Sequence, residues 1–253
     1  MKIGIVTGAS SGIGREYVRQ FDMREDLDQI WVIARRLDRL EELKSVIKTP
    51  IVTICSDLSD KNGDEKLRHM LVDHNPDVRV LVNAAGYGKF GAVEDIVPSE
   101  QLGMVELNIN ALMKITFAAL PYMSKGSKIF FISSRSGFHP VPYITTYAAT
   151  KAFVLSFSRG LGRELKHKKI KTIAVCPGWT RTEFFDRAAD HDDVIVYYNN
   201  FVTPGQVVTR SYKDIDKGKD VSVCGASTRF QVFAAKILPH RLVMNIWCKQ
   251  QNK

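Results

Sequence analysis

A glycine-rich loop between a short apolar strand and a helix is the feature that most constrains this chain. The strand predicted at Lys2 to Val6 leads into Thr7-Gly8-Ala9-Ser10-Ser11-Gly12-Ile13-Gly14, and the helix-forming run Arg15 to Phe21 follows. In this order Gly8 permits a tight turn, Gly12 lets a pyrophosphate approach the backbone, and Gly14 allows the helix to pack closely. Unpaired N–H groups at the helix N-terminus would bind the phosphates. The alternative is an ordinary turn rich in glycine and serine, but the strand-loop-helix order favours a dinucleotide site.

The end of the second predicted strand bears on the choice of cofactor. That strand, Gln29 to Ala34, is followed by Arg35 and Arg36 and by no acidic residue. A site that prefers NAD usually places an acid here to hold the ribose 2′-hydroxyl. Two guanidinium groups could instead bind a 2′-phosphate through charge-assisted hydrogen bonds, with Ser10 as a further donor. The alternative is a pair of solvated arginines, and we expect NADP(H) to be preferred over NAD(H).

Short apolar strands alternate with helical segments along the rest of the chain. Further strands are predicted at residues 50–55, 78–82, 128–133, 171–176 and 221–224, and a long helix at Ser99 to Met123. This alternation predicts a doubly wound, mainly parallel seven-stranded sheet of the Rossmann type, with right-handed crossovers and helices on both faces. At 253 residues with 45% hydrophobic residues, the chain suits one α/β domain. Within it we assign residues 1–100 mainly to dinucleotide binding, 101–182 to catalysis, 183–205 to a substrate lid and 229–253 to an apolar, basic tail.

Polar and small residues follow several of these strands, at the sheet edge where ligands bind in such folds. Asp57 and Leu58 follow the third strand as candidates for contact with adenine, although Asp57 could equally cap the next helix. The small residues of Asn83-Ala84-Ala85-Gly86 would let a cofactor lie against the backbone after the fourth strand. The fifth and sixth strands deliver Ser134, Pro177, Gly178, Thr180 and Thr182 to the same edge.

Tyr147 and Lys151 are four residues apart and should share one face of a helix. A phenol, with an unperturbed pKa of about 10, exchanges protons poorly near neutral pH. A neighbouring ammonium group would stabilise the phenolate and lower that pKa, so Tyr147 could act as a general acid or base. The same spacing also occurs by chance on solvated helix faces, so the interpretation depends on the residues that precede this pair.

Taken together, these motifs resemble the short-chain dehydrogenase/reductase family. They are the loop from Thr7 to Gly14, Asn83-Ala84-Ala85-Gly86, Asn108, Ser134, Tyr147-x-x-x-Lys151 and Pro177-Gly178-x-x-x-Thr182. The resemblance covers about residues 1 to 225 in order and spacing. It departs at Ala84, where the family often has a second asparagine, and we expect this to affect local packing more than chemistry.

The resemblance implies a catalytic tetrad of Asn108, Ser134, Tyr147 and Lys151. Ser134 would hydrogen-bond the substrate oxygen, and Tyr147 would transfer a proton. Lys151 would also hold the nicotinamide ribose, and Asn108 would hold a water in a proton relay. As an isolated residue, Asn108 is more often simply a satisfied polar group of a helix. Thr180 and Thr182 would anchor the nicotinamide carboxamide.

The implied activity is NADP(H)-dependent hydride transfer to or from a carbonyl or secondary alcohol. Aromatic residues between Trp179 and Phe201 favour a lipophilic substrate. The C-terminal tail is similar to that of relatives that reduce steroids or long acyl chains, which implies a steroid-like or long-chain compound. We predict that Ser134, Phe138, Tyr147, Trp179 and Phe184 contact the substrate, although the aromatic residues could instead pack the lid on the domain. The alternatives are a 3-oxoacyl thioester reductase that uses an acyl carrier protein and, more remotely, a non-catalytic NADP(H) sensor.

The last 25 residues, Arg229 to Lys253, should form one or two helices broken near Pro239. Their predicted apolar face consists of Phe230, Phe233, Ile237, Leu238, Leu242, Val243, Ile246 and Trp247. Three interpretations remain open: packing on its own domain or on a symmetry mate, covering the substrate cleft, or lying on an anionic membrane surface.

The net charge of +9 is compatible with nucleic acid, an anionic membrane surface or a phosphorylated cofactor as partner. Because the charges are scattered, and the densest cluster at residues 166–169 reads as a solvated helix end, we expect no nucleic-acid partner. We expect a homodimer or homotetramer in the cytoplasm, since no secretory signal and no apolar run of about 18 residues is present. The four cysteines lack zinc-type spacing, so we expect no metal.

Overall fold

One parallel sheet organises the molecule, which is described here by a computed structural model covering residues 1–188, 194–198 and 200–253. Among these residues the sheet has seven strands in the order β3-β2-β1-β4-β5-β6-β7. The strands are β1 (Lys2–Thr7), β2 (Gln29–Ala34), β3 (Ile51–Cys55), β4 (Asp77–Asn83), β5 (Lys128–Ile132), β6 (Lys171–Val175) and β7 (Val221–Ser222). The strand order reverses between β1 and β4, which is the switch point where such sheets bind ligands.

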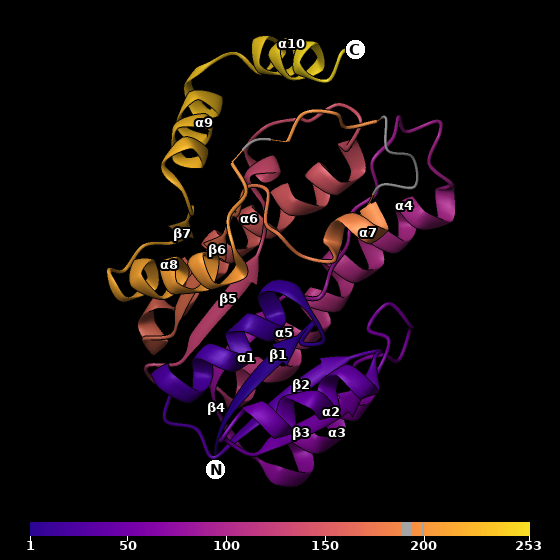
Figure 1. Cartoon of the computed structure of the whole chain (residues 1–253). Coiled ribbons are helices and arrows are strands. Elements are labelled where there is room, and N and C mark those ends of the chain that lie inside the picture. Colours follow the sequence, from indigo (N-terminus) through magenta and orange to yellow (C-terminus); the bar gives the residue numbers. More distant parts are fainter. Residues whose placement is uncertain (189–193, 199) are drawn as a thin grey trace.

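Helices cover both faces of the sheet, as expected for a doubly wound fold (Figure 1). Buried side chains of α1 (Gly12–Arg24), α2 (Leu37–Val46) and α8 (Pro204–Asp216) share one hydrophobic cluster. Those of α3 (Glu65–His74), α5 (Leu112–Ala119) and α6 (Thr145–Glu164) share the cluster on the opposite face. The other helices are α4 (Pro98–Val105), α7 (Phe184–Ala188), α9 (Ala226–Ile237) and α10 (His240–Gln250).

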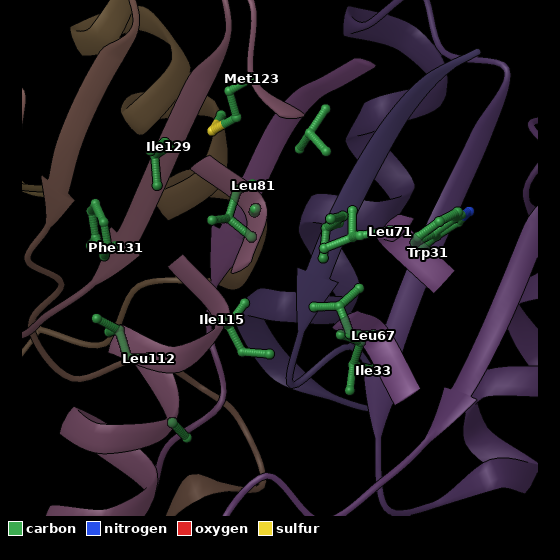
Figure 2. Close-up of a cluster of buried hydrophobic side chains, with 14 of the residues drawn as sticks. Trp31, Ile33, Leu67, Leu71, Leu81, Leu112, Ile115, Met123, Ile129 and Phe131 are labelled. Atoms are coloured by element: carbon green, nitrogen blue, oxygen red, sulfur yellow. The ribbon is translucent and has the colours of Figure 1, made fainter. Parts of the chain in front are cut away.

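The two clusters follow from the alternation of side chains along each strand. In β2, Trp31 and Ile33 enter the cluster of α3 and α5, whereas Ile30 and Val32 enter the one beneath α1 and α2. Figure 2 shows the first cluster, with Trp31, Leu81 and Phe131 of the strands facing Leu67 and Leu71 of α3 and Ile115 of α5. Such strands are apolar on both faces because both are covered, and each fully buried large side chain contributes about 1.5–3 kcal/mol.

The predicted strands are confirmed within a few residues at their ends, and so is the long helix predicted at Ser99 to Met123, which is helical without a break from residue 98 to 122 but changes its helix type along the way. It consists of α4, a π-helical segment Glu106–Ala111, α5 and a 3₁₀ turn Leu120–Tyr122. The turn contains Pro121, which lacks the N–H that would continue an α-helix. The π segment carries Asn108, and such insertions occur frequently at functional sites.

The C-terminal tail forms two helices with Pro239 between them, as predicted. In Figure 1 α9 and α10 lie at the opposite end of the molecule from the N-terminus. The buried Trp247 of α10 packs with Phe90 and Ile144, and its Nε1 donates to the Pro142 carbonyl at 2.9 Å. Of the three interpretations left open for the tail, α10 shows packing on its own domain. Phe230 and Phe233 of α9 remain 71% and 60% exposed.

None of the helices within the described ranges is both long enough and apolar enough to cross a membrane.

Candidate active site

A cavity of about 510 Å³ lies along the carboxyl ends of the strands. It brings together almost all of the residues that the sequence predicts to bind cofactor or substrate: Gly8, Ser10, Ser11, Gly12, Ile13, Gly14, Arg35, Arg36, Asp57, Leu58, Ala84, Ala85, Gly86, Ser134, Tyr147, Lys151, Pro177, Gly178, Trp179, Thr180, Thr182 and Phe184. Asn83, Asn108 and Phe138 do not line it. Asn83 is buried beside the cavity, where its Nδ2 donates to Thr116 Oγ1 at 3.0 Å.

The glycine loop has the shape expected of a phosphate cradle. Gly8 and Gly12 have φ angles of +66° and +56°, which favour glycine, and a Cβ on Gly8 would stand 2.8 Å from the Ala85 nitrogen. A Cβ on Gly14 would collide with the Gly8 carbonyl. The first turn of α1 contains no acidic residue and its Ser11 N-cap makes no side-chain cap bond. The helix N-terminus can therefore offer backbone N–H groups to an anion in the cavity.

Arg35 and Arg36 line the cavity beyond this loop, and both have carboxylate partners, of which Glu183 is exposed and Asp57 is half-buried. Arg35 Nη1 is 3.3 Å from Asp57 Oδ2, and Arg36 Nη2 is 2.8 Å from Glu183 Oε2. Arg36 also donates to Ser10 Oγ at 3.2 Å. Ion pairs this exposed are worth only about 0–1 kcal/mol, so a phosphate could replace either partner at little cost.

Asp57 stabilises its own turn as well as lining the cavity, but it does not cap the next helix, whose N-cap is Asp64. Its Oδ1 accepts hydrogen bonds from the backbone N and the Oγ of Ser59 at 2.9 and 2.5 Å. Burial alone would raise the pKa of Asp57, but the bonds from Ser59 and Arg35 lower it below its usual value. The carboxylate is therefore charged and held in place at neutral pH.

Tyr147 and Lys151 lie on α6, and Ser134 follows β5 on the same wall of the cavity. Lys151 Nζ is 5.6 Å from the centre of the Tyr147 ring and donates to the Ile132 carbonyl at 2.9 Å. Burial raises the pKa of Tyr147 to about 12, against the opposing effect of a hydrogen bond with Ser134. Burial also lowers the pKa of Lys151 to about 8. The predicted depression of the Tyr147 pKa by Lys151 is therefore not found, because burial is the main cause of the shift of the Tyr147 pKa and raises it.

Asn108 is buried in the π-helical segment, and its side-chain amide is fully engaged by protein groups. Its Oδ1 accepts from the Tyr87 N–H at 3.0 Å, and its Nδ2 donates to the Tyr87 carbonyl at 2.9 Å and to Thr150 Oγ1 at 3.0 Å. These bonds agree with the alternative of a satisfied helix polar group. They fix the loop after β4 next to α6, one turn from Tyr147, and the water relay stays a prediction.

Replacing Asn108 by alanine should lower the free energy of unfolding by about 2 kcal/mol or more, because the buried N–H and carbonyl of Tyr87 would lose their partner. Asn110→Ala is the matched control, since the exposed Asn110 lies in the same segment and donates only to Glu106. That variant should change stability by less than about 0.5 kcal/mol. Denaturant unfolding of both variants measures the difference, and equal losses would contradict this role of Asn108.

Aromatic rings form the outer wall of the cavity. Phe90 is 6.2 Å from both Trp179 and Phe184, centre to centre, and Phe184 is 5.5 Å from Tyr147. Tyr198 lies farther out, where it packs on Phe185 at 5.6 Å. The aromatic residues thus have both of the roles suggested by the sequence: some line the cavity and others pack the lid on the domain. Residues 189–193 and 199 of the predicted lid lie outside the described residues.

Phe138 is a correction to the predicted substrate residues. Its ring packs in a separate hydrophobic cluster with Val232 of α9, and the Lys236 Nζ lies 5.1 Å from its centre. Phe138 is the last residue of the 3₁₀ turn Arg135–Phe138 and is not among the residues that line the cavity. Sequence reasoning missed Leu107 and Ile144, which line the cavity beside Asn108 and Tyr147. Their positions next to those two residues are the signal that could have identified them.

No group of three or more His, Cys, Asp or Glu side chains suited to a metal ion occurs in the part of the chain that the structure describes.

Comparison with known proteins decides the family. The family model described as short chain dehydrogenase matches residues 2–193. The chain belongs to the short-chain dehydrogenase family. The sheet order and the residues gathered at its carboxyl edge agree with this membership, and the resemblance found in the sequence is confirmed.

Individual members of the family differ in how much of this chain they match. An uncharacterized oxidoreductase of Bacillus subtilis is 36% identical over 185 residues, which are 70% of this chain and 61% of that protein. A very-long-chain 3-oxoacyl-CoA reductase of Danio rerio is 34% identical over 192 residues, 72% of this chain and 60% of that protein. A short-chain dehydrogenase from Sphingobium yanoikuyae, solved in complex with NADPH, has a TM-score of 0.78 and 26% identity, with 97% of this chain and 96% of that chain covered.

Proposed function

We propose that this protein is an NADP(H)-dependent oxidoreductase that transfers hydride between nicotinamide and a lipophilic carbonyl or secondary alcohol. The observation that carries the proposal is the common cavity: Ser134, Tyr147 and Lys151 line the same space as the glycine loop and the two arginines. Membership of the dehydrogenase family supports the reaction class. The neighbour in complex with NADPH supports the cofactor.

The residues present fit a nicotinamide nucleotide. The N–H groups at the start of α1 would hold the pyrophosphate, Arg35 and Arg36 the 2′-phosphate, and Thr180 and Thr182 the carboxamide. When bound, the nicotinamide would supply or accept the hydride. Protein side chains at the cavity wall would carry out the other steps, which are the orientation of the substrate oxygen and the donation of a proton.

Ser134 Oγ would orient the substrate oxygen, and the Tyr147 hydroxyl would donate a proton to it. With a pKa of about 12, Tyr147 is protonated at neutral pH and suited to act as the acid in carbonyl reduction. Lys151, with a pKa of about 8, is mostly charged there and would stabilise the phenolate as it forms. These two protonation states favour reduction of a carbonyl near neutral pH.

The aromatic wall of Phe90, Trp179 and Phe184 supports a lipophilic substrate, either steroid-like or long-chain. A 3-oxoacyl thioester is the alternative, and the similarity to the Danio rerio reductase favours it. A non-catalytic NADP(H) sensor has less support, because a sensor has no use for Ser134 and Tyr147 on one cavity wall.

A screen of long-chain ketones, cyclic ketones and 3-oxoacyl thioesters tests the proposal, with the oxidation of NADPH as the measured signal. We expect at least one ketone or thioester to be reduced at a rate that depends on protein concentration. Binding of NADPH without oxidation by any of these compounds would overturn the enzyme and favour the sensor.

Replacing both Arg35 and Arg36 by alanine should weaken NADPH binding far more than NADH binding. Each charge-assisted hydrogen bond to the 2′-phosphate is worth about 1.5–3 kcal/mol, and NADH lacks that phosphate. Arg39→Ala combined with Lys44→Ala is the matched control, because it removes the same charge from the exposed side of α2. Titration of intrinsic fluorescence gives the six affinities of the wild type and the two variants for NADPH and NADH, and equal losses for NADPH and NADH in the Arg35/Arg36 variant would refute the assignment.

We propose further that the chain forms a homodimer or homotetramer in the cytoplasm. The exposed Phe230, Phe233 and Ile237 of α9 support a partner of some kind, and the four cysteines are free, as in a reducing compartment. Contact with an anionic membrane surface is the alternative, favoured by the absence of Asp and Glu from residues 221–253. The mass of the full chain in solution, with and without anionic vesicles, separates the two.

A further inference from the structure

Arg135 follows the predicted catalytic Ser134 and lies between two cavities. It lines the 510 Å³ cavity described above together with Ser136, and both residues also line a second cavity of about 170 Å³. The second cavity lies between the 3₁₀ turn Arg135–Phe138 and the two C-terminal helices, which contribute Val232, Leu238 and Trp247. We call it the apolar annex. A half-buried guanidinium therefore stands at the boundary between the candidate active site and an apolar space.

This guanidinium has no carboxylate partner among the described residues. Its Nη1 donates to the neutral Gln231 Oε1, and its central carbon lies 5.1 Å from the centre of the Trp179 ring. By contrast, Arg68, Arg159 and Arg210 each pair with an aspartate at 2.7 Å. Burial lowers the pKa of Arg135 to about 10, so the group is still charged at neutral pH. A desolvated cation without an anion is unfavourable, and a bound anion would relieve that cost.

Two more polar groups beside Arg135 lack hydrogen-bond partners. Trp179 Nε1 and His139 Nδ1 are both buried and unpaired in the part of the chain that the structure describes. Burial, together with the charges of Arg135 and His240, lowers the pKa of His139 to about 4, so its ring is neutral at pH 7. Trp179 lines the main cavity and His139 the apolar annex. The indole N–H and the guanidinium are both donors, and they would suit an anionic oxygen that accepts several hydrogen bonds.

We propose that Arg135 is the anion-recognition residue of the substrate site, and that the substrate is a lipophilic carbonyl compound that carries a carboxylate. The reacting carbonyl would lie at Ser134 and Tyr147, the carboxylate at Arg135, and adjoining hydrocarbon in the apolar annex. This substrate class rests on the proposed reductase function. The site that would bind a carboxylate beside a hydrocarbon group requires only the side chains of Arg135, Trp179 and the apolar annex.

The test measures binding of two inert probes of equal chain length, decanoate and decanamide, to the full chain by calorimetry. A charge-assisted hydrogen bond to Arg135 should make decanoate bind about tenfold more tightly than decanamide. Arg135→Gln should abolish this preference, and Arg135→Lys should retain part of it. Arg181→Gln is the matched control, because it removes one exposed positive charge outside both cavities and should leave the preference intact.

Equal affinities of the wild-type chain for decanoate and decanamide would overturn the proposal without any variant. So would a preference for decanoate that survives Arg135→Gln in a folded protein. Because neither probe is reduced, the result is independent of catalysis. If the carbonyl screen detects no turnover but decanoate binds through Arg135, the reductase assignment fails and the anion site stands. If the screen detects turnover but the chain does not prefer decanoate, the reductase assignment stands and the anion site fails.

Discussion

Tyr147→Phe is expected to slow hydride transfer by a factor of about 10² to 10⁴ while the protein keeps its fold. The change removes the proton that Tyr147 would donate, but it keeps the ring that packs at 5.5 Å from Phe184. NADPH binding should be nearly unchanged, because the remaining cofactor-binding residues are untouched. Single-turnover reduction and NADPH titration measure the two quantities separately.

Tyr143→Phe is the matched control, since Tyr143 precedes α6 and does not line the cavity. It should leave the rate of reduction within about twofold of the wild type, as expected for a change away from the reacting groups. An active Tyr147→Phe protein would show that another group donates the proton. The family membership would then be right about the fold and misleading about the mechanism.

Lys151→Ala should be as severe as Tyr147→Phe, and it should also weaken NADPH binding. The substitution removes the charge that would stabilise the Tyr147 phenolate and a predicted contact to the nicotinamide ribose.

The wild-type protein should itself reveal the charge on Lys151 in the pH dependence of its rate. Because burial lowers the pKa of Lys151 to about 8, the ammonium is present below that pH and is lost as the pH rises through it.

The rate of carbonyl reduction should therefore fall above about pH 8, while Tyr147, with a pKa of about 12, remains protonated. The measurement is the single-turnover rate with saturating NADPH across this range. A rate that stays constant up to about pH 10, near the pKa of an ordinary lysine, would show that the charge on Lys151 has no part in the step.

The sequence predicted the positions of the strands and the edge at which the site forms, because both depend on local patterns. Apolar runs such as Gln29–Ala34 identify strands, and residues that follow parallel strands must meet at one edge. The glycine loop was found for the same reason, since Gly8 and Gly12 need positive φ angles that few other residues adopt.

The remaining features depend on contacts between residues distant in the sequence. The pKa of Tyr147 is set by burial beneath Phe184 and the loop containing Gly88, which no spacing along α6 encodes. Phe138 was assigned to the cavity by its nearness to Ser134, but α9 packs against it from the other side. The apolar annex beside Arg135 is lined by residues such as Gln231 and Trp247, which lie about a hundred positions away in the sequence.

α8 was missed for a different reason, because its signal is local. Thr203 and Gln206 form a capping box and Pro204 stands at the first helical position, a pattern that predicts a helix start. The predicted lid ended at residue 205, and no helix was named between it and the strand predicted at residues 221–224.

The last turn of the chain bears on how the protein matures during synthesis. Gln251, which is buried, accepts hydrogen bonds through its Oε1 from the backbone N–H groups of Val196 and Tyr197 at 2.9 and 3.0 Å. On a translating ribosome the strands and their helices emerge first, and domains generally begin to fold from the N-terminal side. The lid backbone gains this support only after Gln251 leaves the exit tunnel. The nascent chain can thus begin to assemble its nucleotide-binding half before the contact between Gln251 and the lid backbone is made.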